Sequence, residues 1–319
     1  MQIGKNKTII YGFGSAALDF RIEVADLGCD YKDKLLARNT TILGGGAVAN
    51  CLIQVARVGG KTSLLSKLGD DWIGNLIKKQ LCLEKVDCSN IIQDPSVCSP
   101  FNLAIYAGEK LRRVGGFLVP NSLAELSFED ILFLSSNIKK EDWVIVEVGE
   151  IPLDITLVFC QQVKKKGANL LVDIDLDPVK QCRGNSNLVK DIIRLSDFLI
   201  PNYYAMQTLY PDITPEELIK KLADEFKVIT IITVGADGVY YCQPGNSVVH
   251  QNAFEVKVVD TVGAGDAFHG GLLYGLASNW SLPKAVELGA RCGAYNCQNF
   301  GAREGMPTAE ELDINNIKK

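Results

Sequence analysis

The second half of the chain alternates between helical and strand-like blocks of apolar residues. Apolar residues recur at the spacing of an amphipathic helix in four places, at residues 128–134, 153–166, 188–196 and 215–226. Between these blocks lie nearly continuous apolar runs, at residues 143–148, 170–174, 198–200 and 228–234. Strands that are buried on both faces read as continuous apolar runs. The pattern therefore predicts an α/β fold with a doubly wound, mainly parallel sheet flanked by helices.

The first third of the chain shows a different pattern, in which apolar and polar residues alternate one by one. Residues 18–24 follow this alternation, and residues 101–105 repeat it. A period of two indicates strands with one covered face and one exposed face. We expect the segments at about 18–43 and 99–121 to form a small sheet beside the main body, within a single domain spanning residues 1–319.

A turn that contains two glycines lies at residues 260–268, with the sequence Asp-Thr-Val-Gly-Ala-Gly-Asp-Ala-Phe. Alternating apolar residues predict a strand at 254–258, and helical spacing predicts a helix from about Ala264. Because Gly263 and Gly265 lack a Cβ, an anion can approach their backbone N–H groups closely. The dipole of the following helix adds positive potential at the same point. These features together predict a phosphate site at the turn.

Asp266 lies in the first turn of this predicted helix. An acidic residue there commonly stabilises the helix dipole, which is one explanation of its position. A carboxylate beside an anion site can instead remove the proton from a hydroxyl, while the N–H groups stabilise charge on a transferred phosphoryl group. The spacing of the residues permits both roles.

A second glycine-rich stretch, at residues 44–46, precedes a predicted helix that is apolar on nearly all sides. Asn50 and Arg57 lie on one polar stripe of this helix. A solvated stripe explains Arg57. Asn50 differs because it lies in an early turn behind three glycines, where the backbone must pass close to another group.

Two other glycine motifs resemble nucleotide-binding loops but lack the context that such loops require. Residues 12–17 have the form G-x-G-x-x-A of a dinucleotide-binding turn, yet strand-like alternation follows where a helix is needed. Residues 60–62, Gly-Lys-Thr, lack the upstream glycine of a P-loop, because Val55 occupies that position. We therefore place no nucleotide at either motif.

The two remaining glycine stretches carry a family resemblance. Residues 260–268 resemble the signature of the ribokinase-like (PfkB) carbohydrate kinases, and residues 45–50 resemble the first signature of its fructokinase and 2-keto-3-deoxygluconate kinase types. The resemblance implies a ribokinase-like fold in which the small sheet is a lid over the substrate. It implies Asp266 as the general base and an anion hole formed by Gly263, Ala264 and Gly265. It further implies substrate contacts from Asp19, Gly45, Gly46 and Asn50.

Weaker landmarks of the same family lie on the nucleotide side. The resemblance implies that ATP is bound by Asn202, by Asn296 near the adenine, and by a turn containing Thr233, Gly235 and Gly238. It also implies Mg²⁺ at the phosphates. A monovalent cation such as K⁺ is implied near Asp260 and Val262.

Two positions depart from the family pattern. Ala205 stands where the Asn-x-x-Glu element beginning at Asn202 has its glutamate, a residue linked to Mg²⁺ and phosphate. Asp177 stands where an Asp-x-Asn-x-Arg element has its arginine. We expect either reduced activity or a metal held by another group such as Asp173.

The composition excludes several classes of protein. Of 319 residues, 47% are hydrophobic, and the formal net charge of −5 leaves no basic excess for neutralising nucleic-acid phosphates. The ten cysteines include no Cys-x-x-Cys pair, which indicates free thiols in a reducing compartment. No uninterrupted apolar run approaches the ~18 residues of a membrane span, and the N-terminal residues do not form a signal peptide. We expect a cytoplasmic protein that binds neither nucleic acid nor membranes.

The sequence thus predicts an ATP-dependent phosphotransferase that acts on a primary hydroxyl of a sugar or sugar acid. A nucleoside kinase of the same fold is an alternative, since it would share the phosphate-side residues and differ around Asp19 and Asn50. A non-catalytic sugar or nucleotide sensor is another, because it would explain Ala205 and Asp177. Relatives commonly pair through the lid, so a homodimer through the small sheet is a further expectation.

Overall fold

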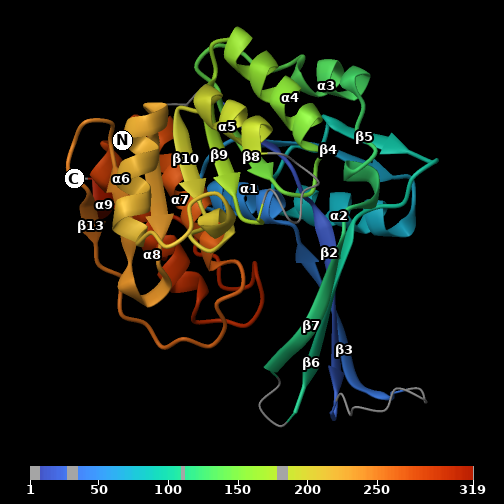
Figure 1. Cartoon of the computed structure of the whole chain (residues 1–319). Coiled ribbons are helices and arrows are strands. Elements are labelled where there is room, and N and C mark those ends of the chain that lie inside the picture. Colours follow the sequence, from blue (N-terminus) through green and yellow to red (C-terminus); the bar gives the residue numbers. More distant parts are fainter. Residues whose placement is uncertain (1–7, 27–34, 109–111, 178–185, 319) are drawn as a thin grey trace.

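A large twisted sheet forms the centre of the molecule (Figure 1). The computed structural model describes residues 8–26, 35–108, 112–177 and 186–318, and within them this sheet has nine strands. In spatial order they are β13 (Val249–Gln251), β12 (Val239–Cys242), β11 (Ile229–Thr233), β10 (Phe198–Pro201), β9 (Asn169–Ile174), β8 (Trp143–Val148), β1 (Ile10–Phe13), β4 (Thr62–Gly69) and β5 (Ile91–Asp94). The strands from β11 to β5 are parallel, and β12 and β13 add an antiparallel edge. The predicted doubly wound sheet is confirmed.

Helices cover both faces of the sheet. One layer contains α1 (Ala47–Arg57), α2 (Trp72–Leu83), α7 (Ala264–Ala277), α8 (Leu282–Asn296) and α9 (Ile314–Lys318). The other contains α3 (Phe128–Ser135), α4 (Leu153–Lys165), α5 (Ser186–Leu195) and α6 (Pro215–Phe226). Successive residues of a strand pack against opposite layers of helices. Val144 and Val146 of β8 pack on the side of α3 to α6, and Ile145 packs on the side of α1 and α7. This two-sided burial is why the strands read as continuous apolar runs.

Polar caps explain where several helices begin. Thr214 and Glu217 form a capping box at the start of α6, and Ser127 and Asp130 form one at α3. The Asp71 side chain accepts a hydrogen bond from Gly74 N and caps α2. Among the described helices, none is both long enough and apolar enough to cross a bilayer.

A four-stranded small sheet projects from the main body (Figure 1). Its order is β3 (Ala37–Gly45), β2 (Ala17–Val24), β6 (Phe101–Ala107) and β7 (Arg112–Val119). The central pair, β2 and β6, is parallel, and the outer pairs are antiparallel. The small sheet expected from the alternation at residues 18–43 and 99–121 is therefore present.

One element differs from the sequence prediction, and one capping box does not begin a helix. Residues 254–258 form irregular backbone instead of a strand, because they have no neighbouring strand: Val258 is 59% exposed, and Val259 N donates to Cys297 O at the end of α8. The capping box of Thr308 and Glu311 is present, but it opens a series of turns. The last helix begins only at Ile314, after Asp313 has adopted a left-handed φ of 48°.

Phe13→Ala tests the core between β1 and α4. Phe13 is fully buried and stacks on Phe159 with ring centroids 3.8 Å apart, so its removal leaves a cavity. We expect the free energy of unfolding to fall by about 3–5 kcal/mol in denaturant titrations. Phe128→Ala is the matched control, because Phe128 is 56% exposed and its loss should cost about 0.5 kcal/mol. Equal losses for both variants would contradict this account of the core.

Candidate active site

Two adjoining cavities meet above the carboxyl ends of the parallel strands. The first, of about 950 Å³, lies against α7 and α8, and we call it the α7–α8 cavity. The second, of about 750 Å³, reaches the small sheet. We call it the acidic cavity for the carboxylates that line it, those of Asp19, Glu147, Glu150, Asp173, Asp175, Asp260 and Asp266. Both cavities touch Thr233, Gly235 and Gly265, so one elongated ligand can span them.

The turn before α7 is held by its own polar groups. Asp260 accepts hydrogen bonds from Val262 N and from Gly301 N, both at 3.1 Å. Gly263 has a φ of 75°, and a Cβ there would lie 2.3 Å from Ala302 O. Glycine is therefore required at 263 by both conformation and space.

The first turn of α7 leaves backbone donors directed into the site. Ala264 N donates to Thr261 O at 3.2 Å, so its N–H group is not free, contrary to the prediction for Ala264. The N–H groups of Gly265 and Asp266 have no acceptor among the described residues. A Cβ on Gly265 would meet nothing within 4 Å. The N–H groups of Gly265 and Asp266 are therefore available to a ligand, at the turn where the sequence predicts an anion.

Asp266 lines the acidic cavity at the N-terminus of α7. Its Oδ2 accepts a hydrogen bond from Asn50 Nδ2 at 2.7 Å. Burial raises the pKa of Asp266 to about 7, and the nearby Asp175, Glu147 and Asp19 act in the same direction, while the Asn50 bond lowers it. A carboxyl group with a pKa near neutrality can accept and release a proton under ordinary conditions.

The glycines before α1 allow a close approach by other groups. A Cβ on Gly45 would lie 2.1 Å from Asp19 Oδ1, and Gly46 has a φ of 92°. Asp19 Oδ1 also accepts a hydrogen bond from Asn102 Nδ2 at 2.7 Å. The structure therefore brings Asp19, Gly46 and Asn50 together in the lining of the acidic cavity, whereas Gly45 lies behind the lining.

Other carboxyl groups of the acidic cavity are in environments that favour their neutral forms. Burial, followed by the charges of Glu147 and Asp19, raises the pKa of Glu150 to about 8. Burial also raises the pKa of Asp173, whose Oδ2 lies 3.4 Å from His269 Nδ1. The pKa of His269 is lowered by burial to about 4. Asp173 is thus a buried group paired with a neutral imidazole, whereas Asp175 is exposed.

The two departures from the family pattern, Asp177 and Ala205, follow the ends of β9 and β10. Asn202 Nδ2 donates to Asp175 Oδ1 at 3.2 Å. Ala205 is buried beneath them, and Asp177 is hydrogen-bonded to Thr208 outside the cavity lining. Asp175 is therefore the exposed carboxylate next to Asn202.

The α7–α8 cavity contains most of the residues predicted for the nucleotide. Thr233, Gly235 and Gly238 line it, whereas Asn202 lies in the acidic cavity. Asn296 lines neither cavity. It is fully buried, and its Nδ2 donates to Val262 O at 3.0 Å, so the structure shows no route by which Asn296 contacts a ligand in this cavity.

Sequence reasoning missed several residues of the site. Glu150 and Asn102 line the acidic cavity, and Arg303 binds Asn50 from below through a 2.6 Å hydrogen bond. Glu150 follows the end of β8, a position that the strand prediction could have marked. Arg303 lies in an irregular segment without periodicity, and the adjacent charged Glu304 leaves no sequence signal that distinguishes it. Arg57 is not a solvated residue as predicted, because it pairs with Glu84 at 2.7 Å.

The match to a family model covers nearly the whole chain. The model of the pfkB family carbohydrate kinases matches residues 8–309. The chain is 25% identical over 281 residues to a ribokinase of Lactococcus lactis, with 88% of each chain covered. It is 27% identical over 295 residues to a fructokinase of Escherichia coli, covering 84% of this chain and 90% of the relative.

Solved structures show the same fold. Arabidopsis thaliana ribokinase complexed with ribose and ATP matches with a TM-score of 0.83 at 21% identity, over 98% of this chain and 99% of that one. Escherichia coli phosphofructokinase-2 in complex with potassium matches with a TM-score of 0.80 at 17% identity, over 98% and 100%. These matches identify the architecture as ribokinase-like. Together with the family match, they show that the chain belongs to the pfkB family of carbohydrate kinases.

Proposed function

We propose that this kinase transfers the γ-phosphoryl group of ATP to a primary hydroxyl of a sugar, with Asp266 as the general base. One observation carries the proposal: the Asp266 carboxylate and the free N–H groups of the α7 N-terminus lie where the two cavities meet. An alcohol in the acidic cavity and a triphosphate extending from the α7–α8 cavity would meet at this point. The ATP and ribose of the Arabidopsis ribokinase complex support the assignment of donor and acceptor.

The proposed transfer follows from the positions of the donors and the base. Asp266 Oδ removes the hydroxyl proton as the substrate oxygen bonds to the γ-phosphorus, and the bond to the ADP oxygen breaks. The N–H groups of Gly265 and Asp266 stabilise the charge on the moving phosphoryl group, helped by the positive end of the α7 dipole. The Asn50 hydrogen bond keeps the Asp266 carboxylate directed into the cavity.

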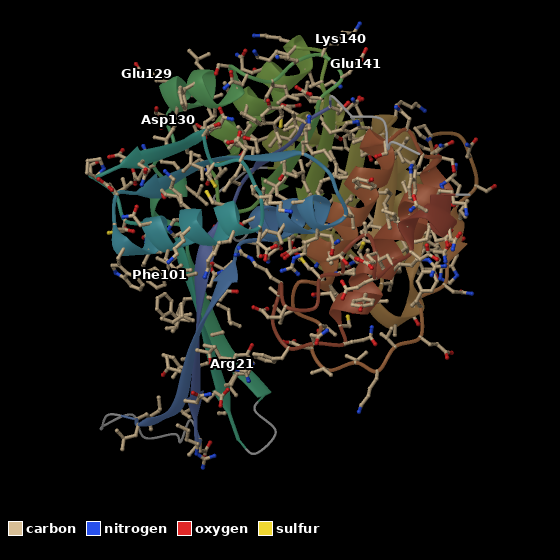
Figure 2. The ribbon with its side chains drawn as sticks, turned by 180° about the vertical axis from the view of Figure 1, so that it is seen from behind. Arg21, Phe101, Glu129, Asp130, Lys140 and Glu141 are labelled. Carbon is tan, nitrogen blue, oxygen red and sulfur yellow. The ribbon has the colours of Figure 1, made fainter. Side chains whose placement is uncertain are left out.

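The charge of the acidic cavity favours a neutral acceptor over a sugar acid. A substrate carboxylate would face Asp19, Asp175 and Asp266, whereas sugar hydroxyls can donate hydrogen bonds to them. Arg21, which lies on the small sheet (Figure 2), is also one of the residues that line this cavity. Its charge is already matched by Glu23, whose Oε1 lies 3.0 Å from Arg21 Nε, and its guanidinium stacks on Tyr106.

Mg²⁺ fits the site with few protein ligands. Among the described residues, no cluster of three or more His, Cys, Asp or Glu side chains is arranged to hold a metal. Mg²⁺ is commonly bound by one or two carboxylates together with phosphates and water. The exposed Asp175 beside Asn202 would hold it in place of the glutamate absent at Ala205. When bound, Mg²⁺ would neutralise charge on the phosphates.

A monovalent cation fits the loop that supports the α7 N-terminus. Asp260 and the Val262 carbonyl supply oxygen atoms there. Asn296 Oδ1 is buried and has no hydrogen-bond partner in the described part of the chain. These are the oxygen atoms that the protein would contribute to a K⁺ site.

The small sheet, which borders the acidic cavity, would act as the lid. Its exposed residues Phe117 and Ile42 are suited to pairing with a second copy of the chain.

A panel of acceptors tests the proposal. We expect ATP-dependent ADP release with ribose, fructose or another neutral sugar, and a lower kcat/KM with 2-keto-3-deoxygluconate because of the acidic lining. ADP release with adenosine, and with no other acceptor of the panel, would identify a nucleoside kinase. Binding without ADP release across the panel, measured by thermal shift, would identify a sensor.

Asp266→Asn is the matched variant for this panel. The substitution keeps the size of the side chain and removes the basic oxygen, so kcat should fall roughly 10²–10⁴-fold. ATP binding, followed by calorimetry, should persist. Wild-type turnover in this variant would exclude Asp266 as the base.

The pH dependence should report the same group. Because Asp266 must be deprotonated to act and its pKa lies at about 7, kcat/KM should be constant in alkaline solution. Below that pKa it should decrease about tenfold per pH unit. An acidic limb near pH 4 would show that another group, or an unperturbed carboxyl, controls the rate.

Gly265→Ala and Gly263→Ala separate the anion site from the fold. A methyl group on Gly265 meets no protein atom but occupies the space proposed for phosphate, so kcat/KM should fall at least roughly tenfold with the melting temperature preserved. Gly263→Ala forces a left-handed alanine against Ala302 and should cost about 1–3 kcal/mol of stability. Wild-type activity in Gly265→Ala would show that the phosphate does not bind at Gly265.

A further inference from the structure

Arg303 is a buried cation between the glycine turn and α7. It belongs to the segment after α8, and only 6% of the residue is exposed. Burial lowers the pKa of its guanidinium to about 10, so the group remains charged at neutral pH. A buried charge is tolerated only where hydrogen-bond partners surround it.

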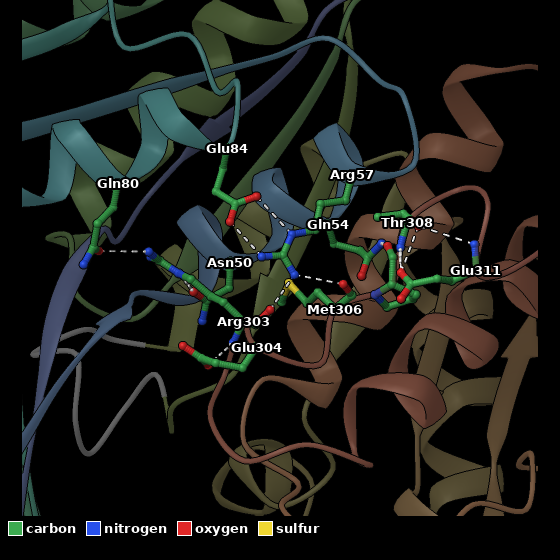
Figure 3. Close-up of polar contacts among 11 residues, drawn as sticks. Asn50, Gln54, Arg57, Gln80, Glu84, Arg303, Glu304, Met306, Thr308 and Glu311 are labelled. Atoms are coloured by element: carbon green, nitrogen blue, oxygen red, sulfur yellow. Dashed lines mark hydrogen bonds and ion pairs between the residues drawn. The ribbon is translucent and has the colours of Figure 1, made fainter.

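Two of its partners, Asn50 and Gly45, belong to the predicted substrate side of the site, and Figure 3 shows Arg303 beside Asn50 and Gln80. Arg303 Nε donates to Asn50 Oδ1 at 2.6 Å, and Nη2 donates to Gly45 O at 2.6 Å. A third, longer bond of 3.4 Å joins Nη1 to Gln80 Oε1. A Cβ on Gly44 would lie 2.0 Å from Nη1, which explains the first glycine of the turn.

The bond to Arg303 determines which end of the Asn50 amide faces Asp266. Because the guanidinium binds Asn50 Oδ1, the Nδ2 group points to the opposite side and donates to Asp266 Oδ2. The reversed amide would place its NH₂ group against the guanidinium and its oxygen against the carboxylate. Both of those contacts join groups of like polarity.

The segment that carries Arg303 is itself held in place. Arg57 Nη1 donates to Arg303 O at 2.6 Å and to Met306 O at 2.8 Å (Figure 3). The other side of the Arg57 guanidinium binds both carboxylate oxygens of Glu84. Arg303 therefore projects from a fixed backbone, and its side chain has a defined direction.

We propose that Arg303 is a positioning residue, which holds the Gly45 carbonyl in the substrate turn and orients Asn50 toward the base. The inference rests on the proposed function, since it assigns Arg303 to the reaction of the same site. It acts through Asn50 and Gly45, and no contact between Arg303 and substrate is required.

The groups around Asp266 make the expected change in pKa specific. These groups are Asp19 on β2, Cys51 on α1, Glu147 on β8, Asp173 and Asp175 at the end of β9, His269 on α7, and Arg303. Burial and the carboxylates favour the protonated form of Asp266, whereas the Asn50 bond favours the charged form. Loss of the correct Asn50 orientation should therefore raise the pKa of Asp266.

Arg303→Met is the test, because it keeps an unbranched chain and removes every donor. We expect the acidic limb of kcat/KM to move upward by about one pH unit. At pH 7 kcat should fall roughly tenfold, and KM for the sugar should rise because Gly45 is no longer held. Arg303→Lys retains one donor group and the charge, so it should show smaller changes in the same direction. It also provides a second variant if the methionine variant does not fold.

Arg303→Lys is the control for the charge beside Asp266, with which Arg303 interacts electrostatically. Arg194→Gln is the control for the change in net charge. Arg194 lies on α5, pairs with Asp191 on the surface, and should leave the pH profile unchanged. Melting temperatures identify any variant that has lost its fold. If Arg303→Met and Arg303→Lys fold normally and the acidic limb does not move, the inference is wrong.

A measurement independent of turnover separates this inference from the proposed function. The Asp266 carboxyl can be titrated by ¹³C NMR in the labelled wild type and assigned by its absence in Asp266→Asn. We expect its pKa to rise in Arg303→Met even without substrate, and an unchanged titration would overturn the inference. A wild type that phosphorylates nothing in the panel would overturn the proposed function, whatever the titration shows.

Discussion

The hydrogen bond between Asn50 and Asp266 joins residues 216 positions apart and depends on an unusually close approach of two helices. Gly270 makes that approach possible. A Cβ on Gly270 of α7 would lie 2.5 Å from Gln54 Cβ and 2.7 Å from Cys51 O on α1. With a larger residue at 270 the helices would have to separate, and the amide of α1 could no longer reach the carboxylate of α7. The geometry of the site thus follows from backbone packing below it.

Crowded carboxyl groups are the second constraint on this site. Asp19, Glu147, Glu150, Asp173 and Asp266 approach one another from different elements, and burial and mutual repulsion shift the pKa values of four of them upward. Such an arrangement is costly unless donors meet it. Ser15 supplies two to Glu147, from its hydroxyl and its backbone N–H. All five carboxyl groups line the cavity, where hydroxyl groups of a ligand can form further hydrogen bonds with them.

The sequence predicted the architecture well because burial leaves a direct record in it. The predicted run at residues 143–148 coincides with β8, and the proline and acids after Thr214 mark the start of α6. The candidate site was predictable where the sequence pattern is uncommon, as at the glycines that precede α7 and at Asn50 behind three glycines. It was not predictable where tertiary contacts decide. The hydrogen bond of Ala264 N, the burial of Asn296 and the partners of Arg303 all depend on segments that meet only in the folded chain.

The small sheet is connected to the body by very short links at two of its strands. Only residues 14–16 separate β1 from β2, and only Gly46 separates β3 from α1. Asp19 and Gly45 travel with the sheet, whereas Asn50 travels with the helix that begins one residue after the link. Any rotation of the sheet would therefore have to be absorbed at Gly46, at the turn around Ser15, and at the links before β6 and after β7. A rotation about these links would carry the wall of the cavity that bears Asp19 past the wall that bears Asn50.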